Sequence, residues 1–531
     1  MFKSSEVKFG DYFKLPNQGL KSYFGKVVKG QSKVYDTPFA KGESTTHLLN
    51  QWNEVLKSID DEWPTLYEYE MEMRGKVGPL SVMAPLSERM PSIEEYYQSV
   101  KGNFAPISER AIKAVLSEWG RARGLKMRNQ ANTLAKMKLS TNSGSPFFTK
   151  RRNVIKETSP CTATSPGGTV LQMLPGGEWN ACAVLGWRGQ EGGSSKEDVK
   201  QRVVWMFPFA VNLLELQVYQ PLIESAQKFN IVPAWVSNAQ VDKEITQLFD
   251  TKGPEDLIVC TDFTAFDQHF NRSLQNAARA VIAGILAPHA KHSGWLAEVF
   301  PIKYQIPLAY DYGKIKYGEH GMGSGSGGTN ADETLAHRCL QYEAAQTMGK
   351  RLNPHSMCLG DDGILTFPGI TVDDVVRCYT QHGLEMNDSK QYSSTQDCIY
   401  LRRWHHASYR VDGVCAGVYP TMRALGRLRY LERFMDPEVW GPKMVALRQL
   451  SILENVKYHP LKEKFVDFCM KRDKYRLGID IPGFLANIED EAKKATDYMP
   501  DFLGYTNSLQ ADATGVGIES WWIINYLKSL S

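Results

Sequence analysis

The chain has 531 residues, of which 42% are hydrophobic and 23% charged, and its formal net charge at pH 7 is +3. This composition is typical of a globular protein with a large core and excludes collagen-like and disordered chains. The small net charge means that any nucleic-acid surface must be local. We find neither a signal-peptide segment near Met1 nor an apolar run of roughly 18 residues, so we expect no membrane-spanning helix.

The cysteines are scattered along the chain. They lie at positions 161, 182, 260, 339, 358, 378, 398, 415 and 469. Because none forms a Cys-x-x-Cys pair, the sequence predicts neither a zinc site of that kind nor a disulfide framework. We expect these residues to be reduced.

The first 100 residues combine lysines with aromatic residues, and two interpretations are open. The segment could be an arm that binds nucleic acid, because bases stack on aromatic rings while lysines follow phosphates. Alternatively, it is a basic extension whose aromatic side chains pack onto the main body, which we favour. The residues are Lys3, Phe9, Tyr12, Phe13, Lys14, Lys21, Tyr23, Phe24, Lys26, Lys29 and Lys33.

The next segment contains a predicted helix, a loop and a basic strand. Apolar residues at helical spacing predict an amphipathic helix at about 108–137. A loop at 141–148 contains Ser143 and Gly144 and is followed by three basic residues. The run 200–207 predicts a strand that begins with Lys200 and Arg202, whose charges could neutralise a triphosphate.

Two aspartates follow an apolar run at 257–261, which predicts a central strand. Asp262 ends this strand, and Asp267 precedes a predicted helix at 273–286. The spacing allows one carboxylate to bind a metal ion while the other faces a different part of the same ligand. Asp267 could instead cap the helix, but capping does not explain Asp262 at the end of an apolar strand.

A loop at 321–330 is rich in glycine and serine and precedes a predicted helix at 331–346. Its glycines match the Gly-x-Gly-x-x-Gly pattern of dinucleotide-binding proteins. That interpretation also requires a βαβ unit and an acid at a strand end about 20 residues on, whereas Glu343 lies inside the helical pattern. The alternative is a small-residue loop that lets the backbone approach a polynucleotide or a ribose.

The most informative stretch is 355–367, in which Gly360-Asp361-Asp362-Gly363 separates two apolar runs. Glycine and aspartate favour turns, so the pattern predicts two short buried strands joined tightly. Two adjacent carboxylates repel each other, which favours a bound cation at the turn. A solvated turn is the alternative.

Taken in order, the basic strand, the two spaced aspartates, the Gly/Ser loop with its helix and the Gly-Asp-Asp hairpin resemble the motifs of right-hand polymerases. The resemblance is to viral RNA-dependent RNA polymerases, and among them to those of small double-stranded RNA viruses such as picobirnaviruses. It spans about residues 141 to 405.

The resemblance implies a role for each matching residue. Asp262, Asp361 and Asp362 would be catalytic and bind two divalent cations, Mg²⁺ or Mn²⁺, and Lys390 would protonate the pyrophosphate. The incoming nucleotide would be bound by Lys200, Arg202, Asp267, Ser324, Thr329 and Asn330. RNA would be bound by Ser143 and Gly144 on the template side and by Arg402 and Arg403 in the primer grip.

One position departs from the family pattern. Many relatives have asparagine four residues after the motif B threonine, whereas this chain has Glu333 four residues after Thr329. The resemblance then implies that Asn330, beside Asp267, recognises the ribose. An acid at position 267 favours ribonucleotides. Asn330 and Glu333 also have the spacing of a capping box, which would make Glu333 purely structural.

The resemblance implies an α+β right-hand fold with an antiparallel palm sheet, closed by an N-terminal extension. The expected division is 1–100 for the extension, 101–255 and 276–318 for the fingers, 256–275 and 319–405 for the palm, and 406–531 for the thumb with a C-terminal tail.

The implied activity is RNA-directed RNA synthesis that replicates and transcribes a viral genome by two-metal-ion nucleotidyl transfer, with de novo initiation. The expected partners are a single-stranded RNA template, nascent RNA, ribonucleoside triphosphates and viral capsid protein, but no membrane. We expect a monomer, located inside the viral particle and in the host cytoplasm.

Two C-terminal features have open interpretations. The arginines at 423, 427, 429 and 433 would contact product phosphates or form a solvated helix face. Trp521 and Trp522 would stack under the first nucleotide at initiation or anchor the tail, and we favour anchoring.

Two other classes of protein compete with the polymerase. A nicotinamide or flavin enzyme would use 323–328 but leaves the acidic hairpin unexplained. A non-enzymatic RNA-binding or coat protein would use the basic N-terminus but needs no cluster of acids.

Overall fold

An antiparallel four-stranded sheet carries the acidic residues of this α+β protein. The computed structural model describes residues 8–436, 438–498 and 517–531. The strand order is β11-β6-β10-β9, with bounds Tyr392–Ser394, Ile258–Thr261, Asp362–Leu365 and Met357–Leu359. Every pairing in the sheet is antiparallel. All residues of β6 are buried and the strand lies inside the sheet, which confirms the predicted central strand and the predicted hairpin.

Helix α14 (Thr329–Thr347) runs along the hairpin formed by β9 and β10. Its Gln341 side chain donates a hydrogen bond of 2.8 Å to the backbone oxygen of Met357. Three further helices pack against α14, namely α5 (Glu109–Glu118), α11 (Arg272–Ile285) and α15 (Val372–Thr380). The helices predicted at 273–286 and 331–346 are therefore confirmed.

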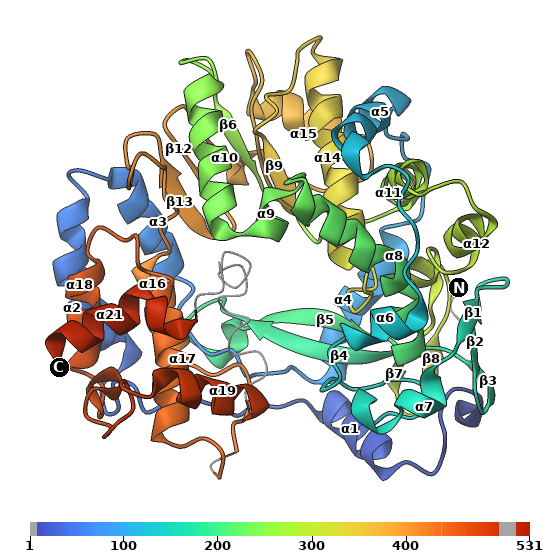
Figure 1. Cartoon of the computed structure of the whole chain (residues 1–531), viewed down its shortest axis with the longest axis horizontal. Helices are drawn as coiled ribbons and strands as arrows, with labels where there is room; N and C mark the ends of the chain where they lie inside the picture. Colours follow the sequence, from blue (N-terminus) through green and yellow to red (C-terminus); the bar gives the residue numbers. More distant parts are fainter. Residues whose placement is uncertain (1–7, 437, 499–516) are drawn as a thin grey trace.

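A second four-stranded sheet has the order β5-β4-β7-β8. The bounds are Lys200–Met206, Ala183–Gln190, Leu308–Asp311 and Lys314–Lys316. The long antiparallel pair of β4 and β5 extends towards the middle of the molecule in Figure 1. The predicted basic strand is thus β5. A smaller sheet consists of β1 (Thr162–Thr164), β2 (Leu171–Leu174) and β3 (Gly177–Asn180).

The single helix predicted at about 108–137 is wrong. Helix α5 ends at Glu118, and α6 covers only Gln130–Ala135. Between them lie Gly120 and Gly124, and Gly124 has φ +87°, a left-handed conformation that ends helical propagation and favours glycine. The apolar spacing that predicted the helix belongs to α5 alone.

The N-terminal segment packs at two sides of the molecule. Helix α1 (Gln18–Lys29) contacts β7, and Phe13 and Phe24 share a core with Val184 and Ile315. Helices α2 (Thr45–Leu56) and α3 (Pro64–Arg74) lie at the opposite side, beside the C-terminal helices (Figure 1). The aromatic side chains from Phe9 onward are thus packed onto the main body, as favoured, while Lys3 lies outside the described residues.

Glu70 of α3 joins the N-terminal segment to the C-terminal helices. Its carboxylate, fully buried, accepts hydrogen bonds from the Thr421 hydroxyl and the Met422 amide, the latter of 3.0 Å. His459 Nε2 lies 3.0 Å from the same carboxylate. Apolar residues of both segments, including Trp52 and Phe465, form one core.

The remaining elements complete the chain. They are α4 (Leu86–Gln98), α7 (Ile155–Thr158), α8 (Phe209–Lys228), α9 (Pro233–Val236), α10 (Asn238–Thr251), α12 (Ala290–Glu298), α13 (Ile302–Gln305), β12 (Asp397–Tyr400), β13 (Arg403–His406), α16 (Thr421–Arg429), α17 (Pro442–Glu454), α18 (Lys462–Met470), α19 (Ile488–Tyr498) and α21 (Trp522–Leu530). Within the described ranges, every helix is too short or too polar to cross a membrane. All cysteines are buried and unpaired, as expected.

Candidate functional site

Strand pairing brings the three predicted acids to one place. Thr261 pairs with Gly363, so Asp262, which directly follows β6, lies beside Asp362, the first residue of β10. Asp361 occupies the two-residue turn with Gly360, because Asp362 already pairs with Leu359. The prediction that both adjacent acids lie in the turn is therefore corrected to Asp361 alone. Gly360 has φ +58°, which glycine adopts without strain.

Helix α14 holds the hairpin turn through two side chains that sequence reasoning missed. The Thr334 hydroxyl accepts a 2.9 Å hydrogen bond from the Gly360 amide, and His337 Nδ1 donates to the Gly360 carbonyl over 2.9 Å. The His337 ring also fills the space where a Cβ at Gly363 would lie, at 2.6 Å. Helix α14 thus fixes the backbone of the turn, while the Asp361 side chain stays exposed.

Gln391, beside β11, fixes the backbone of Asp262 and was also missed. Its Oε1 accepts from the Asp262 amide over 2.7 Å, and its Nε2 donates to the Asp262 carbonyl over 2.8 Å. This reciprocal pair satisfies the Asp262 backbone beyond the end of β6. The Asp262 side chain is exposed and free to bind a ligand.

The carboxylates have the electrostatics of an oxygen-ligand metal site. The Asp361 side chain is partly exposed, but desolvation by the surrounding protein raises its pKa, and the charge of Asp262 raises it further, while the charge of Arg202 opposes the shift. Burial raises the pKa of Asp362 to about 7, although its carboxylate accepts a 2.7 Å hydrogen bond from the Leu401 amide. Among the residues that the structure describes, none of these three acids forms an ion pair with a basic side chain. A divalent cation would relieve this repulsion.

The donor set fits Mg²⁺ or Mn²⁺. In the described part of the chain, the three acids do not form a closed cluster with one oxygen of each within 4.8 Å of the others. An open set of carboxylates suits Mg²⁺, which takes one or two carboxylates and completes its shell with water and substrate phosphate. Asp262 and Asp361 are the more exposed of the three acids, whereas one oxygen of Asp362 accepts a hydrogen bond from the Leu401 amide.

The raised pKa of Asp362 predicts a pH dependence of stability in the metal-free protein. An aspartate in an unfolded chain titrates near ~3.9, so between that pH and about 7 the folded protein holds a proton that the unfolded chain has lost. The free energy of unfolding contributed by Asp362 therefore falls as pH rises through this window and is constant above it.

Urea unfolding in chelator from pH 5 to pH 8 checks this expectation against Asp362→Asn. We expect the free energy of unfolding of the wild type, taken relative to the variant, to fall up to about pH 7 and then to level. Groups far from Asp362 titrate equally in both proteins, so their contributions cancel in the difference between the two free energies of unfolding. A difference that stays constant or rises with pH contradicts the assignment.

Asp267 has Glu333 as an acidic neighbour. Glu333 is 5% exposed, and its carboxyl group and that of Asp267 shift each other's pKa. Asn330 is exposed, and its Oδ1 accepts a 2.8 Å hydrogen bond from Trp235 Nε1. The capping-box interpretation is wrong, because α14 begins at Thr329 with Gly328 as its N-cap and no side-chain cap. The ribose-binding role of Asn330 stays a prediction.

Ser324 and Thr329 hold the Gly/Ser loop together. The Ser324 hydroxyl accepts a 3.2 Å hydrogen bond from the Trp205 amide of β5, and the Thr329 hydroxyl donates to the Gly323 carbonyl over 3.2 Å. The loop therefore rests against the strand that carries Arg202.

Lys200 and Arg202 are exposed at the start of β5. Arg202 Nε donates a 2.8 Å hydrogen bond to Gln190, and its charge acts on both Asp361 and Asp267. Burial lowers the pKa of Lys200, and the charge of Lys76, from the N-terminal segment, lowers it further. Lys76 is thus a basic neighbour of this site that sequence reasoning missed.

Lys390 lines a cavity of about 410 Å³ together with Asp262 and Asp362. The cavity is also lined by residues of α3, among them Glu72, and by Lys76, two residues beyond the end of α3. Lys390 is exposed and can reach a ligand in the cavity. The structure thus places Lys390 in one cavity with Asp262 and Asp362, and its catalytic role stays a prediction.

Comparisons with known proteins agree with this geometry. Residues 125–462 match the family model described as viral RNA-dependent RNA polymerase. The chain belongs to this family. It is 59% identical over 523 residues, covering 98% of both chains, to a potential RNA-dependent RNA polymerase of a human picobirnavirus.

The fold of the polymerase also matches crystal structures of a human picobirnavirus RNA-dependent RNA polymerase. One match has a TM-score of 0.94 and 58% identity, and another, to an insertion-loop deletion mutant, has a TM-score of 0.93 and 56% identity. Each covers 98% of this chain and 99% of the other. The predicted polymerase class is therefore confirmed.

The dinucleotide-binding alternative is wrong for this polymerase. The strand that follows α14 pairs antiparallel with β10, so the Gly/Ser loop does not open a parallel βαβ unit. Glu343 accepts hydrogen bonds from the Ser108 amide and the Gln381 side chain, of 2.7 and 3.1 Å, and is buried. It is therefore engaged within the protein.

Ser143 and Gly144, the predicted template contacts of the polymerase, are buried. The Ser143 hydroxyl accepts a hydrogen bond from Thr149, and the Ser143 carbonyl accepts one from Phe209 at the start of α8. These two residues shape the loop. Contact with RNA at this loop would involve the exposed residues Thr141, in the loop, and Lys150, just after it.

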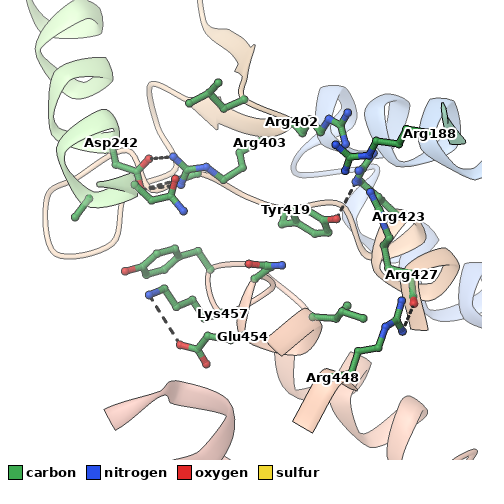
Figure 2. A pocket seen from close by; sticks show the side chains of 17 residues that line it. Arg188, Asp242, Arg402, Arg403, Tyr419, Arg423, Arg427, Arg448, Glu454 and Lys457 are labelled. Atoms are coloured by element: carbon green, nitrogen blue, oxygen red, sulfur yellow. Dashed lines mark hydrogen bonds and ion pairs between the residues drawn. The ribbon is translucent and has the colours of Figure 1, made fainter. Parts of the chain in front are cut away.

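Arg402 and Arg403 have different environments at the turn between β12 and β13. Arg402 is exposed and lines a cavity of about 340 Å³ (Figure 2). Arg403 is buried, and its guanidinium lies 2.8 Å from Asp242. This ion pair holds the turn against α10, and the RNA-binding assignment of Arg403 stays a prediction.

Three members of the predicted arginine cluster lie in α16 and form ion pairs or hydrogen bonds within the protein, whereas Arg433 lies beyond α16 and is exposed. Arg423 pairs with Glu191, and Arg427 pairs with Glu432. Arg429 donates to the backbone oxygen of Phe39 over 2.8 Å. Figure 2 shows Arg423 and Arg427 on the same wall of the cavity as Arg188 and Arg448. These ion pairs and hydrogen bonds link α16 to β4 and to the N-terminal segment.

The two C-terminal tryptophans anchor α21 to α17. Trp521 is 9% exposed, and the Trp522 amide donates a 3.1 Å hydrogen bond to Glu454. The Trp522 ring stacks on Tyr526 at 5.4 Å. Anchoring, the favoured interpretation, is therefore confirmed. Residues 505–516 of the predicted tail lie outside the described residues.

Proposed function

We propose that this polymerase copies single-stranded RNA by two-metal-ion nucleotidyl transfer at the β9–β10 hairpin and initiates without a primer. The observation that supports the chemistry is the convergence of Asp262, Asp361 and Asp362, without a basic partner among the described residues, at the ends of two paired strands. Bound divalent cations would lower the pKa of the attacking 3′-hydroxyl and compensate the charge of the leaving pyrophosphate.

The other side chains would bind and orient the nucleotide. Lys200 and Arg202 would hold the triphosphate, the planar guanidinium of Arg202 acting as a fork. Lys390 would donate a proton to the pyrophosphate, because it is exposed in the cavity that contains Asp262. Asp267 would accept a hydrogen bond from the ribose 2′-hydroxyl, with Asn330, Ser324 and Thr329 shaping the same pocket.

The chain would be divided as in other right-hand polymerases. We propose that the sheet of β6 and β10 is the palm, that the sheet of β4 and β5 belongs to the fingers, and that the helices from α16 onward form the thumb. The N-terminal segment would close the hand, since α1 packs near the fingers sheet and α3 on the thumb. We also propose that the polymerase is a monomer that lies inside the viral particle in contact with capsid protein. It would also be active in the host cytoplasm.

Labelled-UTP incorporation on an unprimed single-stranded RNA template, with Mg²⁺ or Mn²⁺, tests this function. We expect incorporation by the wild type and none by Asp361→Ala/Asp362→Ala. If activity required a primer, the polymerase function would stand and the proposal of de novo initiation would be refuted. No incorporation in either format would contradict the proposed chemistry.

We expect Asp267→Ala to lose preference for ribonucleotides. Removal of one hydrogen bond to a charged group costs about 1.5–3 kcal/mol, which lowers the ratio of UTP to dUTP incorporation efficiency about tenfold to a hundredfold. Single-nucleotide incorporation of each substrate measures the ratio. Asp250→Asn, an exposed acid that pairs with Arg410, serves as the control and should keep the wild-type ratio. An unchanged ratio in Asp267→Ala would count against the role of Asp267.

A further inference from the structure

We propose that Glu343, Cys378 and His382 form a binding site for one zinc ion, separate from the acids of the β9–β10 hairpin. All three residues are buried, with 4% of Cys378 and 1% of His382 exposed. The ligand atoms of the three side chains lie within 4.8 Å of one another. The ion fastens the end of α15 to α14, and the inference does not depend on the proposed mechanism of nucleotide transfer.

Two neighbouring helices supply the three side chains. Cys378 lies in the last turn of α15 and His382 follows four residues later, a spacing that places both side chains on one helical face. The chain stays wound past the end of α15, because the His382 amide donates a 3.2 Å hydrogen bond to the Tyr379 carbonyl. Glu343 reaches the same face from α14, which packs against α15.

The ligand atoms already point towards one another. Glu343 Oε1 accepts hydrogen bonds from His382 Nε2 and, over 3.7 Å, from the Cys378 thiol. Around a tetrahedral zinc ion, an oxygen and a sulfur ligand lie about 3.6 Å apart, and an oxygen and a nitrogen ligand about 3.3 Å apart. The oxygen and the sulfur thus have the spacing of zinc ligands. The oxygen must move away from Nε2, which rotation of the flexible glutamate side chain allows.

The polar atoms that face away from the site are held by the backbone of residues 105–108. His382 Nδ1 donates a 2.6 Å hydrogen bond to the Ala105 carbonyl, so Nε2 is the ring nitrogen that faces the site. Glu343 Oε2 accepts a 2.7 Å hydrogen bond from the Ser108 amide, so Oε1 is the oxygen that faces the site. Histidine and carboxylate ligands of metal ions usually have such outer hydrogen bonds, which orient the ligand atoms before the ion binds.

Gln381 links the site to solvent. The residue is exposed, and its side-chain Nε2 lies 3.1 Å from Glu343 Oε1 and 3.4 Å from His382 Nε2. Movement of this one side chain opens a route for the ion. A water molecule, or the amide oxygen of Gln381 after the amide has turned, supplies the fourth ligand.

The donor set selects zinc rather than the cation that the hairpin acids favour. Mg²⁺ takes oxygen ligands, whereas a set of one sulfur, one nitrogen and one oxygen suits Zn²⁺. On binding, the Cys378 thiol and His382 Nε2 each release a proton to solvent. Glu343 follows His337, which holds the hairpin turn, by six residues, or about 9 Å along the axis of α14. The ion therefore braces the helices behind the sheet.

Zinc analysis and cobalt substitution of the full chain test the inference. The parent for these measurements is Asp361→Ala/Asp362→Ala, in which the hairpin acids no longer compete for the ion. After incubation with Zn²⁺ and removal of unbound ion by gel filtration, we expect one zinc per chain by mass spectrometry of the elements. With Co²⁺ in place of Zn²⁺, we expect the absorption band of cobalt–thiolate charge transfer.

Cys378→Ser, added to this parent, should remove the cobalt–thiolate band and weaken zinc binding at least about tenfold, since even outer hydrogen-bond partners of a metal ligand contribute about 10–100-fold. Cys161→Ser is the matched control and should keep both. Cys161 is also 4% exposed, and its thiol likewise lies 3.7 Å from a side-chain oxygen, Gln130 Oε1.

Loss of zinc and of the band in Cys378→Ser, with both retained in Cys161→Ser, would support the site. A folded parent that retains no zinc would overturn it, as would zinc bound without a thiolate band or a band of equal strength in Cys378→Ser. Should Cys378→Ser fail to fold, Glu343→Gln must weaken zinc binding at least about tenfold. Glutamine keeps the shape of the side chain and an oxygen for the Ser108 amide, so unchanged binding in that variant would also overturn the inference.

Discussion

Asp361→Asn is expected to abolish nucleotide incorporation while the protein stays folded. The Asp361 side chain is exposed in the β9–β10 turn, next to Asp262, and asparagine has nearly the same shape without the charge. A neutral amide is a poor ligand for a hard divalent cation, and loss of several kcal/mol of charge stabilisation lowers the rate by at least about a thousandfold. Primed single-nucleotide incorporation under saturating Mg²⁺ measures the effect.

Stability should not fall in this variant, because the native carboxylate is electrostatically unfavourable without a cation. Desolvation by the surrounding protein and the charge of Asp262 raise the pKa of Asp361, so replacing it by a neutral residue removes repulsion. Asp412→Asn is the matched control, since Asp412 is an exposed acid with φ +50° in another tight turn, between Val411 and Val414. We expect it to retain activity. Incorporation by Asp361→Asn within tenfold of the wild type would refute the metal assignment.

The parts of the fold that follow from local sequence were predicted correctly. Strand β6 is a run of buried apolar residues, and the hairpin is an apolar–Gly-Asp–apolar pattern, so burial and turn chemistry suffice to identify both. The failed helix at 108–137 shows the limit of periodicity, because α5 ends at Glu118 and the left-handed conformation of Gly124 prevents the chain beyond it from continuing as one helix.

The parts of the site that depend on distant segments could not be predicted. Gln391 fixes the backbone of Asp262, and Glu191 pairs with Arg423, although nothing near either residue in the chain indicates its partner. The same holds for Glu333, whose spacing from Asn330 suggested a local capping role. Its carboxyl group is instead a neighbour of Asp267, which lies in the loop after β6, as their mutual pKa shifts indicate. Residue types predicted the chemistry of the site, whereas tertiary contacts decide which side chains are free to perform it.

Helix α14 and the Gly/Ser loop before it also explain why glycine is required at 325. A Cβ there would lie 1.6 Å from the backbone oxygen of Trp205 and 2.8 Å from its carbonyl carbon. Neither atom belongs to a flexible side chain, so a methyl group must push the loop away from β5. That movement would break the Ser324–Trp205 hydrogen bond and the 3.1 Å hydrogen bond from Asn212 to the Gly325 carbonyl.

We therefore expect Gly325→Ala to reduce nucleotide incorporation at least about tenfold and to destabilise the protein by about 1–3 kcal/mol, the usual cost of overpacking. Gly294→Ala is the matched control, because that glycine lies in α12 with no atom within 4 Å of its Cβ position. Alanine there should preserve activity and stabilise the helix by about 0.5–1 kcal/mol. Incorporation assays and urea unfolding of both variants measure the two effects.

Because Arg202 lies on the same strand as Trp205, the loss in Gly325→Ala should include weaker nucleotide binding, seen as a higher KM for UTP. A Gly325→Ala variant with wild-type stability and KM would show that the loop and β5 move apart without cost, and that their contact does not position the nucleotide site.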